Sequence, residues 1–390
     1  MNLLKTIKQF LNPPTMVLPA ICVLMQSFLL IVQHILLYVL MMSEETASTI
    51  RVLASAAVML LAILICFRKK SGLFVKTYFL AVLVLLMTIL IFPQNTEIMI
   101  ELSAKFLIPM VISSALCVIA IGNIHIVERV LDVISWTGFL TSLLLIYAVV
   151  KGLFFMEHYS LSLSYALLVV MIGLYSQKTI YAKVAAIFTA LIVVAIGSRG
   201  ALVFFGTYIL YDMFRNHKKL ILPAVITFIF ILGLLTQFAD FLNDYGIDSR
   251  TLRNIADGSF GESDGRDTVY TMSLKVFWDN CILGVGLFGD RVAIGGYCHN
   301  LFLEILMDFG LIFGGAICLL IIFKYLRLFF KATDDIRDIL VKYSLAFLAP
   351  LMLSGSYLQD YNFGIFVGVF VLLSHELKNR KKYGINYQCR

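Results

Sequence analysis

Charged residues are scarce in this chain of 390 residues: they make up 14% of it, whereas 61% of the residues are hydrophobic. A soluble domain carries more charge than this, so the composition excludes that class. The chain also lacks CxxC and HxxxH spacings, and we therefore expect neither a metal site nor a cofactor. No basic patch interleaved with aromatic residues is present, which excludes nucleic acid as a partner.

What the chain has instead is a series of apolar runs of about 20 residues, the length that crosses a bilayer core of about 30 Å. Within lipid every backbone polar group must be paired internally, so the runs are predicted to be helices of an all-α integral membrane protein. The first run is too long for a signal-peptide core and is predicted to be a retained span. We predict twelve spans, at residues 16–42, 52–67, 73–92, 104–121, 130–150, 160–176, 180–197, 200–214, 220–236, 301–323, 339–354 and 360–376.

The basic residues fall unevenly on the two sides of these spans. With both termini placed inside, 22 of the 31 Lys and Arg residues lie in the cytoplasmic loops and ends. Positive charge is enriched on the cytoplasmic side of membrane proteins, so the net charge of +7 is interpreted as a topology signal. Because the chain shows no linker, low-complexity tract or internal repeat, residues 1–390 are predicted to form a single membrane domain.

One large interruption, residues 237–300, is predicted to be an extracytoplasmic loop between spans nine and ten. It carries nine acidic and five basic residues, and loops of this length are commonly functional. Residues 268–279 are predicted to form an amphipathic helix, either on the membrane surface or over a cavity. Cys281 and Cys298 share this loop, and their pairing stays open because placement alone does not define their geometry.

The first candidate site residue is Arg199, in the sequence Gly-Ser-Arg-Gly between spans seven and eight. The 35 residues from Ile180 to Phe214 must cross the membrane twice, although two full spans need about 40 residues and a turn. The tip of this hairpin is therefore predicted to be recessed, with Arg199 as a ligand for an anion such as phosphate. The alternative is an arginine that extends to the lipid headgroups.

The second candidate is Arg266, in a Gly- and Asp-rich turn before the predicted helix 268–279. Asp264 or Asp267 is a candidate cap for that helix. An arginine between two aspartates is commonly a solvated ion pair of little energetic value, so local sequence alone favours this simpler interpretation.

The third candidate is His299, at the start of span ten. A neutral imidazole there can act as a general base or orient a hydroxyl group. Asn300, Glu304 and Asp308 follow at intervals of four, which places them on one face of a helix and predicts that they line a cavity. The alternative is that Asn300 caps the helix while the two acidic residues lie near the interface.

Glycines recur between Gly284 and Gly315 around this histidine. We interpret those of the loop as shaping it over a cavity, because no helix start follows closely enough for a phosphate cradle. Gly310 and Gly314 form a GxxxG pair, which is typical of close helix packing.

The order of these motifs resembles the O-antigen polymerase and ligase family. The resemblance rests on the GSRG turn, the large outer loop with its GR turn, the GVG sequence, and HN followed by LE and a Gly-rich helix, from about Ala195 to Gly315. It implies a GT-C-type glycosyltransferase fold. It also implies that Arg199 and Arg266 are the essential arginines and that His299 is the catalytic histidine. Asn300 and Glu304 are added here as candidate substrate-binding residues from their positions alone.

Such proteins act on the outer face of the bacterial cytoplasmic membrane, without a metal or a nucleotide sugar. They transfer a glycan from undecaprenyl diphosphate to a sugar hydroxyl. In polymerases the acceptor is another lipid-linked repeat unit, and in ligases it is the lipid A core. The resemblance leaves both activities open. We expect a polymerase because polymerases are the more numerous group, with a chain-length regulator and a flippase as candidate partners.

Two other classes of membrane protein are alternatives to this hypothesis. A transporter or lipid-linked glycan flippase predicts internal repeats and ionisable residues near the membrane midplane, whereas the spans here are almost free of charge. A peptidoglycan glycosyltransferase places its catalytic acid in a different outer loop, and its pattern is not found in this sequence.

Overall fold

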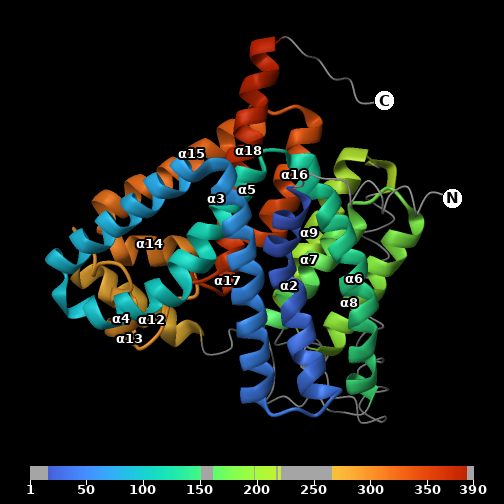
Figure 1. Cartoon of the computed structure of the whole chain (residues 1–390), viewed down its shortest axis with the longest axis horizontal. Helices are drawn as coiled ribbons and strands as arrows, with labels where there is room; N and C mark the ends of the chain where they lie inside the picture. Colours follow the sequence, from blue (N-terminus) through green and yellow to red (C-terminus); the bar gives the residue numbers. More distant parts are fainter. Residues whose placement is uncertain (1–15, 151–160, 197, 217, 221–265, 384–390) are drawn as a thin grey trace. The chain divides into compact units, whose positions relative to one another are not determined.

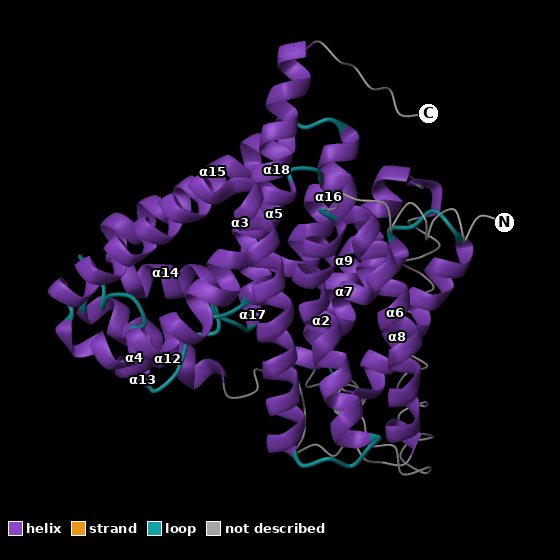
Figure 2. Cartoon of the chain, viewed as in Figure 1, coloured by secondary structure: helices purple, strands orange, loops and turns teal. Residues whose placement is uncertain are grey.

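The computed structural model describes residues 16–150, 161–196, 198–216, 218–220 and 266–383 (Figure 1). These residues form helices joined by loops and turns, and no strand occurs among them (Figure 2). The chain divides into two compact units. Unit 1 contains Met1–Val23, Ala56–Val130 and Asp264–Arg390, and unit 2 contains Leu24–Ser55 and Leu131–Ser263. The prediction that residues 1–390 form a single membrane domain stays a prediction.

Three helices contribute to both units: α2 (Val17–Tyr38), α3 (Glu44–Ile91) and α6 (Ile124–Val150). Unit 2 also contains α7 (Leu161–Tyr175), α8 (Ile180–Ile196) and α9 (Arg199–Asn216). The remaining helices belong to unit 1: α4 (Thr96–Leu102), α5 (Ser113–Ile121), α12 (Arg266–Asp279), α13 (Gly289–Ile294), α14 (Leu301–Phe309), α15 (Gly315–Lys331), α16 (Asp334–Tyr343), α17 (Pro350–Leu353) and α18 (Tyr361–Tyr383).

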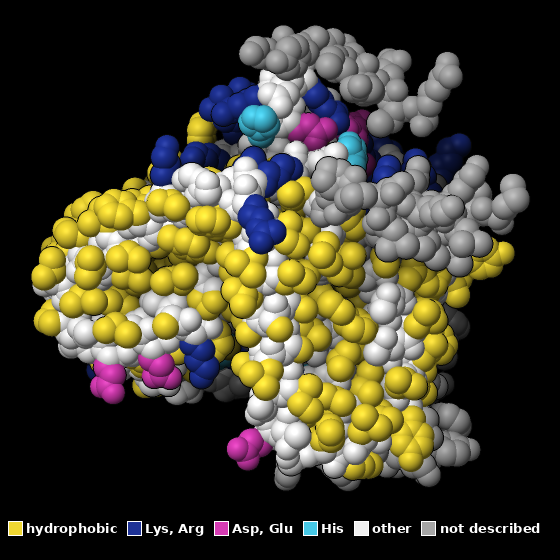
Figure 3. All heavy atoms as spheres, in the orientation of Figure 1, with side chains coloured by type: hydrophobic (Ala, Val, Ile, Leu, Met, Phe, Trp, Pro, Cys, Tyr) yellow, Lys and Arg dark blue, Asp and Glu magenta, His cyan; other side chains and the backbone are white. Residues whose placement is uncertain are grey.

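The helices have the length and composition of a membrane protein. Five helical stretches in the described residues are long and apolar enough to cross a bilayer, and α7 and α8 are shorter apolar helices. Hydrophobic side chains cover the visible flanks, with Lys and Arg gathered near the C-terminal end of α18 in unit 1 (Figure 3). The all-helical membrane class is therefore confirmed, while the number of twelve spans and the GT-C architecture stay predictions. The predicted span at 220–236 and most of the loop at 237–265 lie outside the described residues.

Helix α3 joins two spans that the sequence analysis separated, at 52–67 and 73–92. It continues through the basic cluster between them and departs from helical geometry at Lys70 (φ −136°, ψ 48°). The loop predicted between the two spans is therefore a bend within one helix. The charged side chains can extend away from the helix axis without ending the helix. Lys70 Nζ lies 3.5 Å from the carbonyl oxygen of Ile119, at the end of α5.

The predicted span at 301–323 is a hairpin of two helices. Helix α14 ends at Phe309, and Gly310 takes a positive φ of 68° with ψ −176°, which turns the chain back. Cys318 Sγ lies 4.0 Å from the carbonyl oxygen of Phe302, a separation that only an antiparallel return allows for residues 16 apart. Figure 1 shows α15 running back alongside α14. The sequence is apolar on both sides of Gly310, so hydropathy alone did not predict this turn.

Other predicted spans are interrupted in a milder way. The span at 339–354 consists of α16, a π-helical segment from Ser344 to Leu348, and α17. The span at 104–121 contains another π-helical segment, Ser103–Ile112, which leads into α5.

Helix α18 packs closely against α5 through small residues. A Cβ atom at Gly364 would lie 2.1 Å from the carbonyl oxygen of Val111, and one at Gly368 would lie 2.6 Å from Val118 Cβ. Small residues at this spacing allow helix backbones to approach each other in lipid. This contact anchors α18, whose N-terminus follows the loop that carries part of the candidate site.

Candidate active site

The three predicted site residues lie at helix starts or beside them. Arg266 is the first described residue of α12, and His299 precedes α14; both belong to unit 1. Arg199 begins α9 in unit 2, where the preceding Ser198 is fully buried. The structure thus brings two of the three residues into one unit.

Arg266 and His299 lie near each other. Burial, and then the positive charge of Arg266, lower the pKa of the His299 imidazole below its ordinary value. Both effects disfavour a second proton on the ring. The imidazole is therefore neutral near pH 7, the form in which a histidine can accept a proton.

The backbone at His299 is constrained. Its φ of 54° lies in the left-handed region, which is uncommon for a residue with a side chain. The next residue, Asn300, is extended and caps α14: its Oδ1 accepts hydrogen bonds from the backbone N–H groups of Phe302 and Leu303, both at 3.1 Å. Its Nδ2 donates to the carbonyl oxygen of Met352 at 3.1 Å. The amide of Asn300, predicted as substrate-binding, is in this structure engaged in capping the helix that follows His299.

The polar stripe of α14 faces a protein segment. Ser356 Oγ donates to Glu304 Oε1 at 2.5 Å, and the backbone N–H of Tyr357 donates to Glu304 Oε2 at 3.1 Å. One turn later, the hydroxyl of Tyr357 donates to Asp308 Oδ2 at 2.6 Å. Both acidic side chains are fully buried. Glu304 and Asp308 share one face of α14, as their spacing predicts. The loop between α17 and α18 covers that face, where the sequence analysis had predicted a cavity. The carboxylate of Glu304 is bonded to this loop and to Arg291.

Arg291 stands at the centre of these contacts. Its Nη1 lies 2.5 Å from Asp290 Oδ1 and 2.6 Å from Glu304 Oε1, and its Nη2 donates to Ser356 Oγ at 2.5 Å. Burial opposes the charge, but the carboxylates of Glu304 and Asp290 together raise the pKa of the guanidinium. The arginine therefore stays charged and joins α13, α14 and the loop before α18.

The GVG sequence supports α14 from its C-terminal end. The N–H groups of Val285 and Gly286 donate to the carbonyl oxygens of Met307 and Asp308, at 2.8 and 3.0 Å. Such carbonyls have no partner within their own helix. A Cβ at Gly284 would lie 2.4 Å from the Met307 oxygen, so this approach requires glycine. These glycines fasten the loop to α14.

One tyrosine ring contacts His299, and a further acidic residue lies near that tyrosine. The ring centroids of Tyr297 and His299 are 4.3 Å apart. Burial, and then the charge of Asp360, raise the pKa of Tyr297, which places that carboxyl group nearby. Burial raises the pKa of Asp360 itself to about 6.

Sequence reasoning missed Asp290, Arg291, Tyr297, Ser356 and Asp360. The adjacent Asp290 and Arg291 sit in the same segment as GVG and HN, so their charge in an otherwise apolar region was an available signal. For the residues of the loop before α18 the sequence offered no such signal. Their role depends on contacts with residues 50 or more positions away in the sequence.

Cys281 and Cys298 are both free thiols, and they pack in one apolar cluster with Phe277 and Met307. Phe277 is buried on the predicted helix 268–279, which α12 covers, whereas Met272 of the predicted apolar stripe is exposed. Among the described residues no group of three His, Cys, Asp or Glu side chains is arranged to hold a metal ion.

The fold and the site define a polytopic helical membrane protein with an arginine and a neutral histidine beside a buried ionic network. Residues 184–320 match the family model described as O-antigen ligase. The resemblance found in the motifs is therefore confirmed over that segment. The match contains Arg199, Arg266 and His299, and it ends before Ser356. No curated protein and no solved structure matches the chain.

Proposed function

We propose that this protein is a glycosyltransferase that polymerises lipid-linked repeat units on the outer face of the bacterial cytoplasmic membrane. The donor is a glycan on undecaprenyl diphosphate, and the acceptor is a hydroxyl group of another lipid-linked repeat unit. The anomeric C–O bond to the diphosphate breaks, and the acceptor oxygen forms the new glycosidic bond. One such displacement inverts the anomeric configuration.

The observation that carries this proposal is the neutral imidazole of His299 beside Arg266. His299 takes the proton of the acceptor hydroxyl as the new bond forms. The diphosphate leaves with the electron pair of the broken bond, and a guanidinium directed at that developing charge favours the transition state. Arg266 is positioned near His299 for this role.

Arg199 is proposed as a second phosphate ligand, on the strength of the family resemblance. Helices α8 and α9 have 17 and 18 residues, or roughly 26 and 27 Å at the rise of an α-helix. Both lengths fall short of a bilayer core of about 30 Å, which supports a recessed position for the residues between them. With two arginines for the diphosphate, the reaction as proposed needs no metal.

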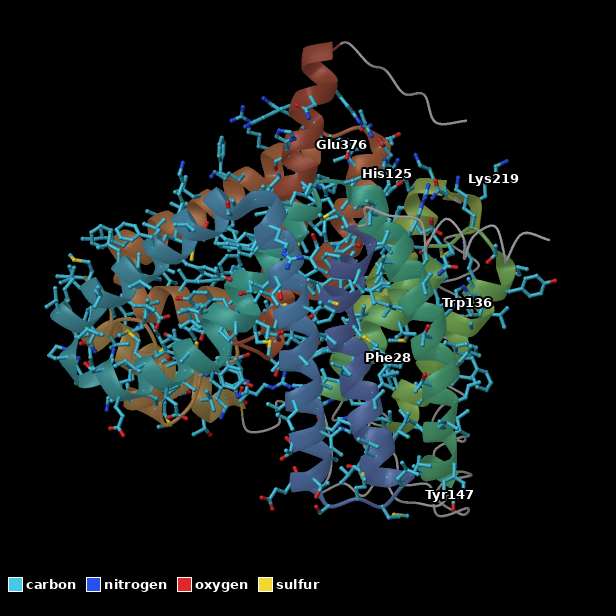
Figure 4. The ribbon with its side chains drawn as sticks, viewed as in Figure 1. Phe28, His125, Trp136, Tyr147, Lys219 and Glu376 are labelled. Atoms are coloured by element: carbon cyan, nitrogen blue, oxygen red, sulfur yellow. The ribbon has the colours of Figure 1, made fainter. Side chains whose placement is uncertain are left out.

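The placement of the site on the outer face is supported by α18. This helix has 23 residues, and its charged residues all lie toward its C-terminal end, from Glu376 on. Its N-terminus follows the loop bonded to α14. Near its other end, Arg380 Nη2 lies 2.7 Å from Asp335 Oδ2 and 2.6 Å from Glu376 Oε1, and Glu376 is labelled in Figure 4. Basic residues mark the cytoplasmic side, so the site is assigned to the opposite side.

Site variants in a strain that lacks the native gene test this proposal. Arg199→Ala and His299→Ala are each expected to abolish long-chain polysaccharide on gels while the protein still inserts. Arg199→Lys is expected to be defective as well, because lysine keeps the charge but loses the planar fork. The exposed histidine His125 supplies the matched control, His125→Ala. Undiminished chain length in both alanine variants contradicts the site assignment.

Ligation to the lipid A core is the second candidate, favoured by the description of the matching family. The two activities are distinguished by the acceptor that each one requires. Incubation of purified protein with the lipid-linked repeat unit alone gives a ladder of longer lipid-linked products if the protein is a polymerase. A product that forms only when core lipid is added identifies a ligase.

A further inference from the structure

The orientation of His299 has no evident hydrogen-bonded support. Its Nδ1 is buried and has no hydrogen-bond partner among the described residues. In many histidine sites a carbonyl or carboxylate bonds to one ring nitrogen and thereby fixes the tautomer and the orientation of the ring. Among the described residues, packing against neighbouring side chains must therefore fix the orientation of the His299 ring.

The ring of Tyr297 is placed to supply it. Its centroid is 4.3 Å from the centroid of the His299 ring, with the two planes inclined by 54°. Aromatic rings in such contact stabilise a definite mutual geometry.

Tyr297 is in turn held by the buried arginine. The guanidinium carbon of Arg291 lies 5.7 Å from the centroid of the Tyr297 ring, within the range of a cation–π contact. Arg291 is itself bonded to Asp290, Glu304 and Ser356. A continuous series of contacts therefore leads from the buried ionic network through Tyr297 to His299.

We propose that Tyr297 is the positioning residue for His299, and that Arg291 fixes the ring of Tyr297 for this purpose. The proposal rests on the proposed function for its catalytic consequence. It also has a purely structural consequence: Tyr297 protects the His299 ring from chemical modification. His299 also has a left-handed backbone conformation, which is uncommon for a residue with a side chain. Strain of this kind persists where the surrounding structure holds it and is concentrated at functional sites.

The test compares Tyr297→Phe, which keeps the ring, with Tyr297→Leu, which removes it. Purified protein in detergent is treated with diethyl pyrocarbonate, which modifies neutral imidazole, and the modification of His299 is followed by mass spectrometry. The exposed His125 gives the reference rate within the same sample. We expect His299 to react several-fold faster in Tyr297→Leu and at the wild-type rate in Tyr297→Phe.

Transfer kinetics form the second readout. Displacement of a catalytic group by about 1 Å lowers a rate on the order of 100-fold, so kcat is expected to fall by about that factor in Tyr297→Leu. KM for the lipid-linked donor is expected to stay within about twofold, since uniform binding is untouched. Tyr297→Phe is expected to retain both constants.

Equal His299 modification in Tyr297→Leu and wild type overturns the proposal, as does an equal loss in Tyr297→Phe. If the reactivity of His299 changes as expected while wild-type protein transfers no glycan, the positioning role stands and the proposed function fails. Size-exclusion chromatography isolates folded protein for each measurement. Tyr297→Met, which fills more of the vacated space, replaces the leucine variant if that variant does not fold.

Discussion

A charged side chain such as Arg291 is costly to remove from water. The penalty for a buried ion is several kcal/mol, which an ion pair offsets only when its geometry is good and its remaining hydrogen-bonding groups are satisfied. Arg291 meets most of these conditions through Asp290, Glu304 and Ser356. Such a network contributes more to a defined geometry than to stability, which fits its place behind the candidate base.

The neutral state of His299 leads to a prediction about pH. Its pKa is lowered by burial and then by Arg266, so the apparent pKa measured from the pH dependence of diethyl pyrocarbonate modification is expected below about 6.5. Arg266→Ala removes the second cause while burial remains, and the apparent pKa is therefore expected to rise. Reactivity at His299 reports this group separately from Asp360, which titrates at about 6.

Lys275→Ala is the matched control for Arg266→Ala, because Lys275 is an exposed cation on the same helix. The control is expected to leave the titration of His299 unchanged. An apparent pKa that moves equally in both variants, or in neither, shows that Arg266 does not act on His299.

At the scale of elements, the hairpin of α14 and α15 creates the site. Helix α14 has nine residues, too few to cross a membrane, and its Glu304 and Asp308 side chains lie buried against the loop before α18. Gly314 then packs against α14, where a Cβ would lie 2.7 Å from the carbonyl oxygen of Ile305. The predicted close packing of the GxxxG pair is confirmed for Gly314, while Gly310 forms the turn.

Gly310→Ala is expected to destabilise this hairpin. The φ of 68° with ψ of −176° at Gly310 lies in a region that is essentially restricted to glycine, so a residue with a Cβ is strained there. At Gly310 that atom would also lie 2.3 Å from the carbonyl oxygen of Ile282, a backbone atom that cannot move easily. We expect a clearly lower Tm in detergent than for wild type.

Gly295→Ala is the milder control. Gly295 has φ 74° and ψ 7°, in the left-handed region that costs a residue with a Cβ roughly 1–2 kcal/mol, and no atom lies within 4 Å of its Cβ position. It is therefore expected to lose less Tm than Gly310→Ala. Equal losses in the two variants contradict the additional cost assigned to Gly310.

The sequence was sufficient to predict the helical class and the shared face of Glu304 and Asp308, because each depends on local spacing. The cap at Asn300 was only the alternative to its prediction as a substrate-binding residue. It was insufficient for the turn at Gly310 and the bend at Lys70, since hydropathy does not record the direction of the chain. It also missed the bond between Arg291 and Ser356. That bond joins residues 65 positions apart, and no local pattern encodes it.

At the scale of the whole molecule, the proposed reaction depends on Arg199, Arg266 and His299 together. All three lie within the segment that matches the O-antigen ligase family. If both arginines bind one diphosphate, they act in a single step, and removing either one weakens the contribution of the other.

The most direct test is a double-mutant cycle on single-turnover release of undecaprenyl diphosphate by purified protein. Arg199→Ala and Arg266→Ala are each predicted to lower the rate by about 100- to 1,000-fold, the usual cost of losing one charge-stabilising group. The double variant is predicted to lose far less than the product of the two factors. A wild-type rate in either single variant, or losses that multiply fully, contradicts a shared diphosphate site.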